Sequence, residues 1–276
     1  MLRPVIIGMI ISHGGENAKV LFSILGPLIV SGDDQIEIPL RQRKQRHLLA
    51  TLALHSPEYL PTERLADLIW GNESSANPGT VRTQVWALRR EPRFASRIGH
   101  DQRGYKLDMR CSEIDADNFI KLSRDGMRFL AGADPERAAA ALGRALGLWR
   151  EPLLGDIPET PGMAPVRDRL LAERTAAQDA FITVRLMLRQ HHQVLGVLRE
   201  RVAKEPEREQ SWAQLMLALY HCGRRAEALD TYTRSWKDLS SEYGIEPGPQ
   251  LRRIHGLILR DDAALQSLRG DQSEFF

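Results

Sequence analysis

The spacing of hydrophobic residues predicts a small β-sheet near the N-terminus of the chain. Lys19 to Val30 is an apolar stretch typical of a strand, and the turn formers Gly26-Pro27 end it. From Ile36 to Leu40 every second residue is apolar, which predicts a short strand with one exposed face. Ser31 to Asp34 supply turn residues between these two stretches. We therefore expect a hairpin-like sheet at this end of the chain.

The period of the pattern then changes to that of helices. A first helix is expected over residues 42–55, because leucines and alanines recur on one of its faces. A second helix opens at Thr62, which we expect to cap it, and ends at Trp70. After a polar loop, a third helix is expected to run from its cap, Thr80, to Arg90.

Two short strands are expected after the third helix. Pro92 ends that helix, because proline cannot continue the backbone hydrogen-bond ladder. Residues 97–100 and 103–107 then have the pattern of a β-hairpin. A small sheet, three helices and a hairpin in this order make a winged helix, which we place at residues 19–110. Residues 1–18 are expected to be a disordered extension ahead of this domain.

The third helix of this domain has an outer face suited to DNA. Val81, Val85 and Leu88 fall on one line at about 100° per residue and should pack inward. The remaining faces then present a hydroxyl group, an aromatic ring and cations, on Thr83, Trp86, Ala87 and Arg90 with Arg82 and Arg89 at the flank. Arginines bond guanine edges or phosphates, and hydroxyl and aromatic groups contact bases. The pattern favours a helix in the major groove, with an ordinary surface helix as the alternative.

Positive charge is concentrated around this helix, although the net charge of the chain is only +2. Residues 80–110 hold 8 Lys and Arg residues against 3 Asp and Glu residues. Four more cations, Arg41, Arg43, Lys44 and Arg46, crowd the first turns of the first helix, where they oppose the helix dipole. A nearby phosphate would stabilise them there. A solvated basic surface is the alternative interpretation.

The second half of the chain predicts helix after helix. We place an all-α domain at residues 111–262 and a tail at 263–276. The expected helices cover residues 117–131, 134–149, 166–189, 191–204, 207–221, 224–243 and 250–261. Gly223 to Tyr232 has the spacing of small and aromatic residues of a tetratricopeptide hairpin, and Asp134 to Leu142 is a looser copy. Stacked hairpins of this kind hold protein partners.

Composition and motifs exclude several classes of protein. The apolar run from Val5 to Ile11 is far too short to span a bilayer and lacks a cleavage site, so we expect a cytoplasmic protein without a membrane partner. Cys111 and Cys222 have no metal or redox spacing, and the 8 histidines form no ligand motif. We therefore expect no metal, no cofactor and no enzymatic activity. The absence of a Gly-Lys pair also excludes a P-loop.

Several separated motifs give the chain a resemblance to a known family. They are Ile24-Leu25-Gly26-Pro27-Leu28, Arg43-Lys44-Gln45-Arg46, Leu65-Ala66-Asp67-Leu68-Ile69-Trp70-Gly71, Gly104-Tyr105-Lys106-Leu107, Ala145-Leu146-Gly147-Leu148-Trp149-Arg150 and Glu242-Tyr243-Gly244-Ile245-Glu246-Pro247. In this order, over about residues 20–260, the chain resembles the Streptomyces antibiotic regulatory proteins. These join an OmpR-type winged helix to a bacterial transcriptional activation domain. The resemblance implies a mainly α fold with small β, in which a winged helix-turn-helix precedes an all-α, tetratricopeptide-like domain.

The resemblance also implies a function. It implies a nucleoid-associated activator of an antibiotic gene cluster, which binds direct DNA repeats near the −35 region as a homodimer and recruits RNA polymerase with its sigma factor. The DNA-binding residues would be Arg43, Lys44, Arg46, Thr80, Arg82, Thr83, Gln84, Trp86, Arg89, Arg90, Arg103 and Tyr105, the last two at the tip of the wing. The loop facing polymerase would contain Glu73, Ser74, Ser75 and Asn77.

The sequence leaves two other functions open. One is a helical-repeat adaptor whose N-terminal domain binds protein, against which the basic stretch at residues 80–110 argues. The other is a DNA-binding repressor, since occupancy of a promoter does not by itself set the sign of regulation.

Overall fold

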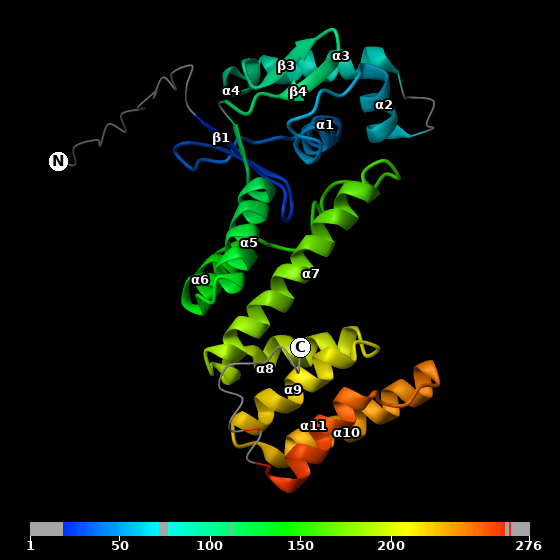
Figure 1. Cartoon of the computed structure of the whole chain (residues 1–276). Helices are drawn as coiled ribbons and strands as arrows, with labels where there is room; N and C mark the ends of the chain where they lie inside the picture. The colour runs from blue at the N-terminus through cyan, green and yellow to red at the C-terminus, as the bar shows by residue number, and fades with distance from the viewer. Residues whose placement is uncertain (1–18, 72–76, 111, 263–264, 266–276) are drawn as a thin grey trace, which may run out of the picture. The chain divides into compact units, whose positions relative to one another are not determined.

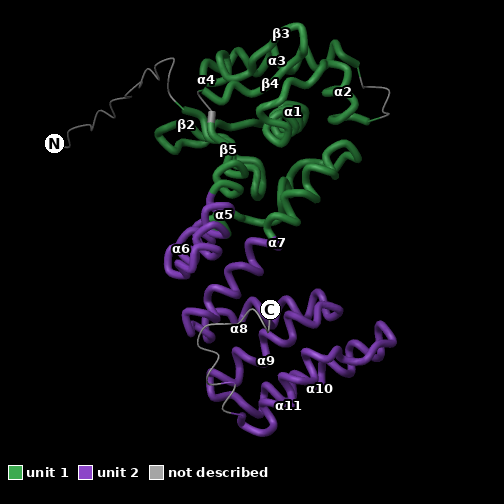
Figure 2. Tube along the Cα trace, viewed as in Figure 1, with its two compact units in different colours: residues 1–121, 145–174 green, residues 122–144, 175–276 purple. Residues whose placement is uncertain are grey.

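The computed structural model describes residues 19–71, 77–110, 112–262 and 265. The chain divides into two compact units (Figure 2). Unit 1 comprises Met1–Lys121 and Ala145–Arg174, and unit 2 comprises Leu122–Arg144 and Thr175–Phe276. The predicted division into domains after residue 110 stays a prediction, and unit 1 contains residues from both sides of it.

Unit 1 contains a winged helix (Figure 1). Its elements are β1 (Val20–Ser23), β2 (Ile29–Gly32), α1 (Arg43–Leu54), α2 (Thr62–Trp70), α3 (Pro78–Arg89), α4 (Pro92–Ala95), β3 (Ile98–Asp101), β4 (Gly104–Leu107) and β5 (Ser112–Ile114). Strand β1 lies at the centre of a three-stranded sheet, antiparallel to β2 and parallel to β5. Strands β3 and β4 form the separate antiparallel hairpin that the sequence predicts.

The N-terminal sheet differs from the prediction in two ways. Lys19 to Val30 holds two strands instead of one, because the backbone N–H groups of Ile24 and Leu25 bond to the Asp115 carboxylate and not to a neighbouring strand. Ile36 to Leu40 forms no strand and makes only an isolated bridge between Ser31 and Glu37. The bridge is made by the bonds from Gly32 N to Ile36 O at 3.2 Å and from Ile38 N to Val30 O at 2.7 Å.

Two predicted helix caps are wrong. Thr62 is the first residue of α2, which follows Pro61 without a side-chain cap. Helix α3 begins two residues before Thr80, and its cap is Asn77, whose Oδ1 accepts a hydrogen bond of 2.7 Å from Gly79 N. Proline at position 78 suits the first helical position because its missing N–H group would be unpaired there in any case. For the same reason Pro92 does more than end α3, since it begins the short helix α4.

A buried carboxylate joins the first strand to the start of helix α5 (Asp115–Ala131). Asp115 Oδ1 accepts a hydrogen bond of 2.8 Å from Ile24 N, and Oδ2 accepts one of 3.1 Å from Leu25 N. The guanidinium of Arg150 lies 3.5 Å from Oδ2. Burial raises the pKa of Asp115 despite these partners, because a charged carboxylate loses hydration there. The sequence analysis did not predict β5, which places this residue beside β1.

The segment between α6 (Pro135–Leu146) and α7 (Ala164–Met187) also belongs to unit 1. Backbone bonds join Arg150 N to Leu25 O at 2.7 Å and Leu154 N to Gly26 O at 2.8 Å. Asp156 accepts a bond of 2.7 Å from Leu28 N and pairs with Arg46. The turn between β1 and β2 is thus held by residues about 125 positions away along the chain.

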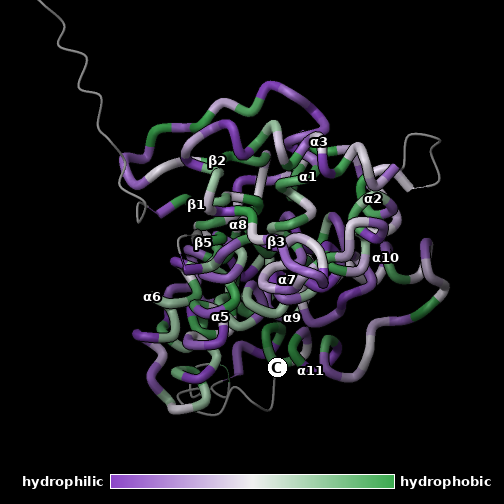
Figure 3. The backbone as a smooth tube through the Cα atoms, turned by 90° about the horizontal axis from the view of Figure 1, so that it is seen from above, coloured by the Kyte–Doolittle hydropathy of each residue, from purple (hydrophilic) through white to green (hydrophobic). Residues whose placement is uncertain are grey.

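Unit 2 is helical, as predicted. Its helices, besides parts of α5, α6 and α7, are α8 (His191–Lys204), α9 (Glu209–His221), α10 (Arg225–Asp238), the π-helical turn Leu239–Tyr243 and α11 (Pro249–Arg260). Helix α9 packs against α8, α10 and α11, and Trp212 at its start is completely buried and donates to Pro206 O at 2.8 Å. Figure 3 shows hydrophobic and hydrophilic positions along these helices. The buried residues of α8, α10 and α11 recur on one face, whereas α9 is buried on all sides from Ser211 to Leu219.

Several helix ends in the second half differ from the expected ones. Helices α5 and α7 each begin two residues earlier, at Asp115 and Ala164, and α9 begins two residues later, at Glu209. Asp134 accepts a bond of 3.1 Å from Arg137 N and precedes the proline that starts α6, as expected, but this helix ends at Leu146 instead of Trp149. Helix α7 ends at Met187, and the last predicted helix begins at Pro249. The expected helix over residues 224–243 changes to π-helical geometry at Leu239.

We expect replacement of Asp115 with alanine to destabilise unit 1 by about 2–4 kcal/mol, because two buried N–H groups would lose their acceptor. Urea unfolding followed by circular dichroism measures this change. The matched control is Asp117→Ala, an exposed acid two residues later on the same helix, with an expected cost below about 1 kcal/mol. Equal stabilities of the two variants would show that the Asp115 hydrogen bonds do not hold the sheet.

Candidate nucleic-acid interface

Helix α3 has the inner and outer faces that its sequence predicts. Val81, Val85 and Leu88 are at most 2% exposed, and they pack towards α1 and α2. The side chain of Trp86 points the other way and is 64% exposed. An aromatic ring that is mostly exposed to solvent is available for contact with a partner molecule.

Three arginines lie near Trp86 on α3 and at its end, and they differ in how far other residues hold their side chains. Arg82 is exposed, and no ion pair or hydrogen bond is found for it within the described residues. The guanidinium of Arg90 lies 5.3 Å from the centre of the Trp86 ring, so the two form a flat cationic and aromatic surface. Arg89 Nη2 donates a bond of 2.6 Å to Ile98 O, which ties the end of α3 to strand β3.

The other polar residues predicted on α3 are less available. Thr83 is exposed, and its hydroxyl group donates a bond of 3.0 Å to Gly79 O within the helix. Thr80 and Gln84 are half-buried, and Gln84 Oε1 is buried without a partner among the described residues. The face that reaches solvent is therefore centred on Arg82, Trp86 and Arg90.

The β3–β4 hairpin is fixed to the loop between α1 and α2. Leu60 N donates to Tyr105 O at 2.8 Å, and Tyr105 N donates to Leu60 O at 2.9 Å. Gly104 has a φ of +116°, and a Cβ atom there would lie 2.0 Å from Leu60 O, so only glycine fits. The wing therefore has a fixed position beside the helices.

Tyr105 was predicted at the tip of the wing, and this prediction is wrong. Its side chain is only 6% exposed, and its ring centre lies 4.4 Å from that of His100. Alternation along a strand places Tyr105 on the inner face of β4 and Lys106 on the other. The Tyr105 side chain therefore packs within the hairpin and is not exposed for contact with another molecule.

A cationic platform on Tyr59 was not predicted from the sequence. The guanidinium of Arg103 lies 4.1 Å from the Tyr59 ring centre, and Lys106 Nζ lies 4.4 Å from it. Asp101 pairs with Arg103 at 2.7 Å, and this hydrogen bond lowers the pKa of the Asp101 carboxyl. Arg103 is thereby held in place while its side chain stays 70% exposed. No local pattern around Tyr59 signals this role, because the two cations come from a hairpin more than forty residues later, Arg103 from its turn and Lys106 from β4.

The basic first turn of α1 is divided between two roles. Arg43 and Lys44 are exposed, and the helix has no acidic residue in its first turn and no side-chain cap. Its free N–H groups and these two cations together suit a phosphate. Arg46 was predicted to join them, but it is mostly buried, pairs with Asp156 and donates to Leu28 O at 2.7 Å. It is a structural residue.

The loop predicted to contact polymerase lies mostly outside the described residues. This holds for Glu73, Ser74 and Ser75. Asn77 is described, and its side chain caps α3. A change at Asn77 would therefore affect α3 itself.

The described residues also limit the other chemistries. Within them, no group of three or more His, Cys, Asp or Glu side chains is arranged to hold a metal ion. None of the helices in the described ranges is long and apolar enough to cross a membrane.

Comparisons with known proteins identify a family and several relatives of the chain. The model of the family described as bacterial transcriptional activator domain matches residues 114–259. The chain is 29% identical over 254 residues to the regulatory protein DnrI of Streptomyces peucetius, covering 88% of this chain and 93% of DnrI. It is 30% identical over 259 residues to the transcriptional regulator RedD of Streptomyces coelicolor, covering 90% of this chain and 72% of RedD.

Two mycobacterial proteins extend the comparison. The chain is 32% identical over 270 residues to the transcriptional regulatory protein MoaR1 of Mycobacterium tuberculosis, covering 91% of this chain and 84% of MoaR1. A solved structure of Mycobacterium tuberculosis EmbR, in complex with a low-affinity phosphopeptide, matches with a TM-score of 0.77 and 25% identity. The match covers 94% of this chain and 69% of that one, and it confirms the predicted fold class.

We expect Trp86→Ala to change the free energy of unfolding by less than about 0.5 kcal/mol, because the ring is in water. Leu88→Ala, two residues later on the buried face, should cost about 2–5 kcal/mol. Urea unfolding of both variants measures the difference. A large loss of stability in Trp86→Ala would mean that α3 is rotated and that its basic face is not the exposed one.

Proposed function

Because the chain belongs to the Streptomyces antibiotic regulatory protein family and is a transcriptional regulator, we propose that it binds double-stranded DNA through α3 and activates transcription. The observation that carries this proposal is the exposed face formed by Arg82, Trp86 and Arg90, opposite a fully buried line of apolar residues. A helix of this kind fits the major groove, where arginines bond guanine O6 and N7.

The rest of the interface supplies contacts to the DNA backbone. The platform of Arg103 and Lys106 on Tyr59 stands on the hairpin that Arg89 ties to the end of α3. In our proposal it binds phosphates beside the groove, and Arg43 with Lys44 binds further phosphates at the N-terminus of α1. Such contacts position the protein on the duplex, and the base contacts of α3 specify the sequence.

We further propose that two protomers bind direct repeats near the −35 region and recruit RNA polymerase with its sigma factor. The target genes are those of an antibiotic or other secondary-metabolite cluster, in line with the family of DnrI and RedD. A repressor would bind the same DNA and differ only in the sign of transcription, which a purified transcription system measures. A protein adaptor would not enrich specific DNA.

The test is selection of genomic DNA fragments by the purified full chain, sequenced at two salt concentrations. Enriched direct repeats beside promoters, with affinity falling steeply as salt rises, are the expected result. Arg82→Ala and Arg90→Ala should each weaken binding to the selected repeat about tenfold, since a good base contact contributes about 1–3 kcal/mol. Arg144→Ala, an exposed arginine on α6, is the matched control and should bind as the unchanged protein does.

Each failure has a definite meaning. Absence of any enriched sequence would contradict DNA recognition and favour the adaptor. Normal binding by both arginine variants, with enrichment intact, would remove α3 from the groove while leaving DNA binding itself established.

The polymerase contact is tested by replacing Glu73, Ser74 and Ser75 together with alanine. We expect unchanged affinity for the selected repeat and a several-fold loss of transcript in a purified system with polymerase. Asn77 is left unchanged, because removal of a cap costs about 0.5–2 kcal/mol and would disturb α3. Full activation by the triple variant would show that this loop does not recruit polymerase.

A further inference from the structure

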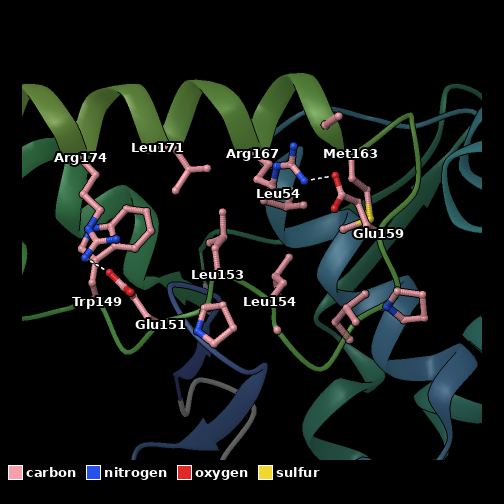
Figure 4. A pocket seen from close by; sticks show the side chains of 15 residues that line it. Leu54, Trp149, Glu151, Leu153, Leu154, Glu159, Met163, Arg167, Leu171 and Arg174 are labelled. Atoms are coloured by element: carbon pink, nitrogen blue, oxygen red, sulfur yellow. Dashed lines mark hydrogen bonds and ion pairs between the residues drawn. The ribbon is translucent and has the colours of Figure 1, made fainter. Parts of the chain in front are cut away.

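Unit 1 contains a cavity of about 460 Å³, a size within the range of small-molecule sites. Its walls come from the first turns of α7, the segment that precedes α7, and Leu54 at the end of α1 (Figure 4). All of the lining residues belong to unit 1. The cavity is separate from the exposed face of α3, and the proposed DNA contacts make no use of it.

The cavity has an apolar middle and an ion pair at each end. Leu153, Leu154 and Leu171 line the middle in Figure 4. Arg174 pairs with Glu151 at one end, and Arg167 pairs with Glu159 at the other. The two arginines are seven residues apart on α7, which separates them by about 10 Å along the helix axis. A ligand of this site must therefore be elongated and largely apolar.

Only one of the two ends has hydrogen-bonding capacity to spare. Arg167 already bonds to Glu159 and, through Nε and Nη2, to Asp168. At the other end, Arg174 Nε and Trp149 Nε1 are both buried and have no hydrogen-bond partner among the described residues. Each buried donor without an acceptor costs about 1–3 kcal/mol, so the groups at this end are held less favourably than those at the other.

Trp149 and Arg174 are held in a fixed geometry. The Arg174 guanidinium lies 4.7 Å from the centre of the Trp149 ring. The rings of Phe119 and Trp149 are perpendicular, with centres 5.3 Å apart. Glu151, the present partner of Arg174, is 56% exposed, so it can move into water when another carboxylate arrives. Glu151 and Leu154 both have positive φ angles, of 22° and 47°, and strained backbone of this kind gathers at ligand sites.

We propose that this cavity binds an amphipathic organic acid. Its acid group pairs with the Arg174 guanidinium in place of Glu151, while its apolar or aromatic body lies along the three leucines. Arginine suits this task because its planar fork matches the two oxygens of an acid group. The cavity thereby becomes an effector site, since Leu54 belongs to α1, which packs against α3.

The probe is 1-anilinonaphthalene-8-sulfonate, with N-phenyl-1-naphthylamine as its neutral counterpart of the same ring system. We expect one saturable fluorescent site per full-length chain, with the acid bound at least about tenfold more tightly than the neutral compound. Arg174→Gln should remove that preference and leave the neutral compound unaffected. Leu153→Trp should fill the cavity and abolish the binding of both compounds.

Glu151→Gln makes the test independent of misfolding. It removes the competing carboxylate, so we expect the acid to bind about three- to tenfold more tightly, a gain that damage to the fold would not produce. Arg144→Gln is the control for loss of an arginine and should change neither affinity. Circular dichroism melting curves check that every variant is folded.

Three results would overturn the proposal. The first is absence of saturable binding. The second is equal binding of the two compounds, with no effect of Arg174→Gln on either affinity. The third is normal binding by Leu153→Trp. The second would leave an apolar cavity without acid recognition, and the third would place the probe elsewhere. None of the measurements contains DNA, so their failure does not bear on the proposed function of α3.

Discussion

Unit 1 depends on one buried carboxylate. Asp115 receives the backbone N–H groups of Ile24 and Leu25, which would otherwise have no acceptor where β1 ends. The same side chain begins α5 and lies beside Arg150, so the sheet, the helix and the later segment meet at it. The carboxylate is tolerated at this depth because the backbone N–H groups of Ile24, Leu25 and Ala116 and the guanidinium of Arg150 surround it. The orientation of β1, and with it the turn that Arg46 and Asp156 hold, follows from that single position.

The winged helix and the segment before α7 are therefore one structure. The chain leaves unit 1 within α5 and returns to it at Ala145, where Arg150 and Leu154 add backbone bonds to the β1–β2 turn. The cavity lies in this returning segment and reaches the last residue of α1. Any ligand there would act on the body that carries α3, through packing that already exists, with no need for a signal from unit 2.

The sequence predicted what depends on neighbours along the chain. The spacing of Val81, Val85 and Leu88 correctly predicted that Trp86 is exposed, because residue spacing along a helix fixes the direction of each side chain. It failed where a distant residue decides. Arg46 pairs with Asp156 instead of a phosphate, and Tyr105 is buried beside Leu60 and His100. Tyr59 receives its two cations from the β3–β4 hairpin. Strand β5 was not predicted, because it is only three residues long and pairs in parallel with a strand about ninety positions earlier.

The path of the chain through unit 1 has a consequence for building hybrid regulators. A designer who exchanges DNA specificity between two relatives would naturally join them after the wing, near residue 110. That junction would combine a new β1–β2 turn with the recipient's own residues at positions 115, 150, 154 and 156. The five hydrogen bonds between the turn and these residues would then have to form between two different proteins. The transplantable module is discontinuous, and it comprises the winged helix together with residues 112–121 and 145–174.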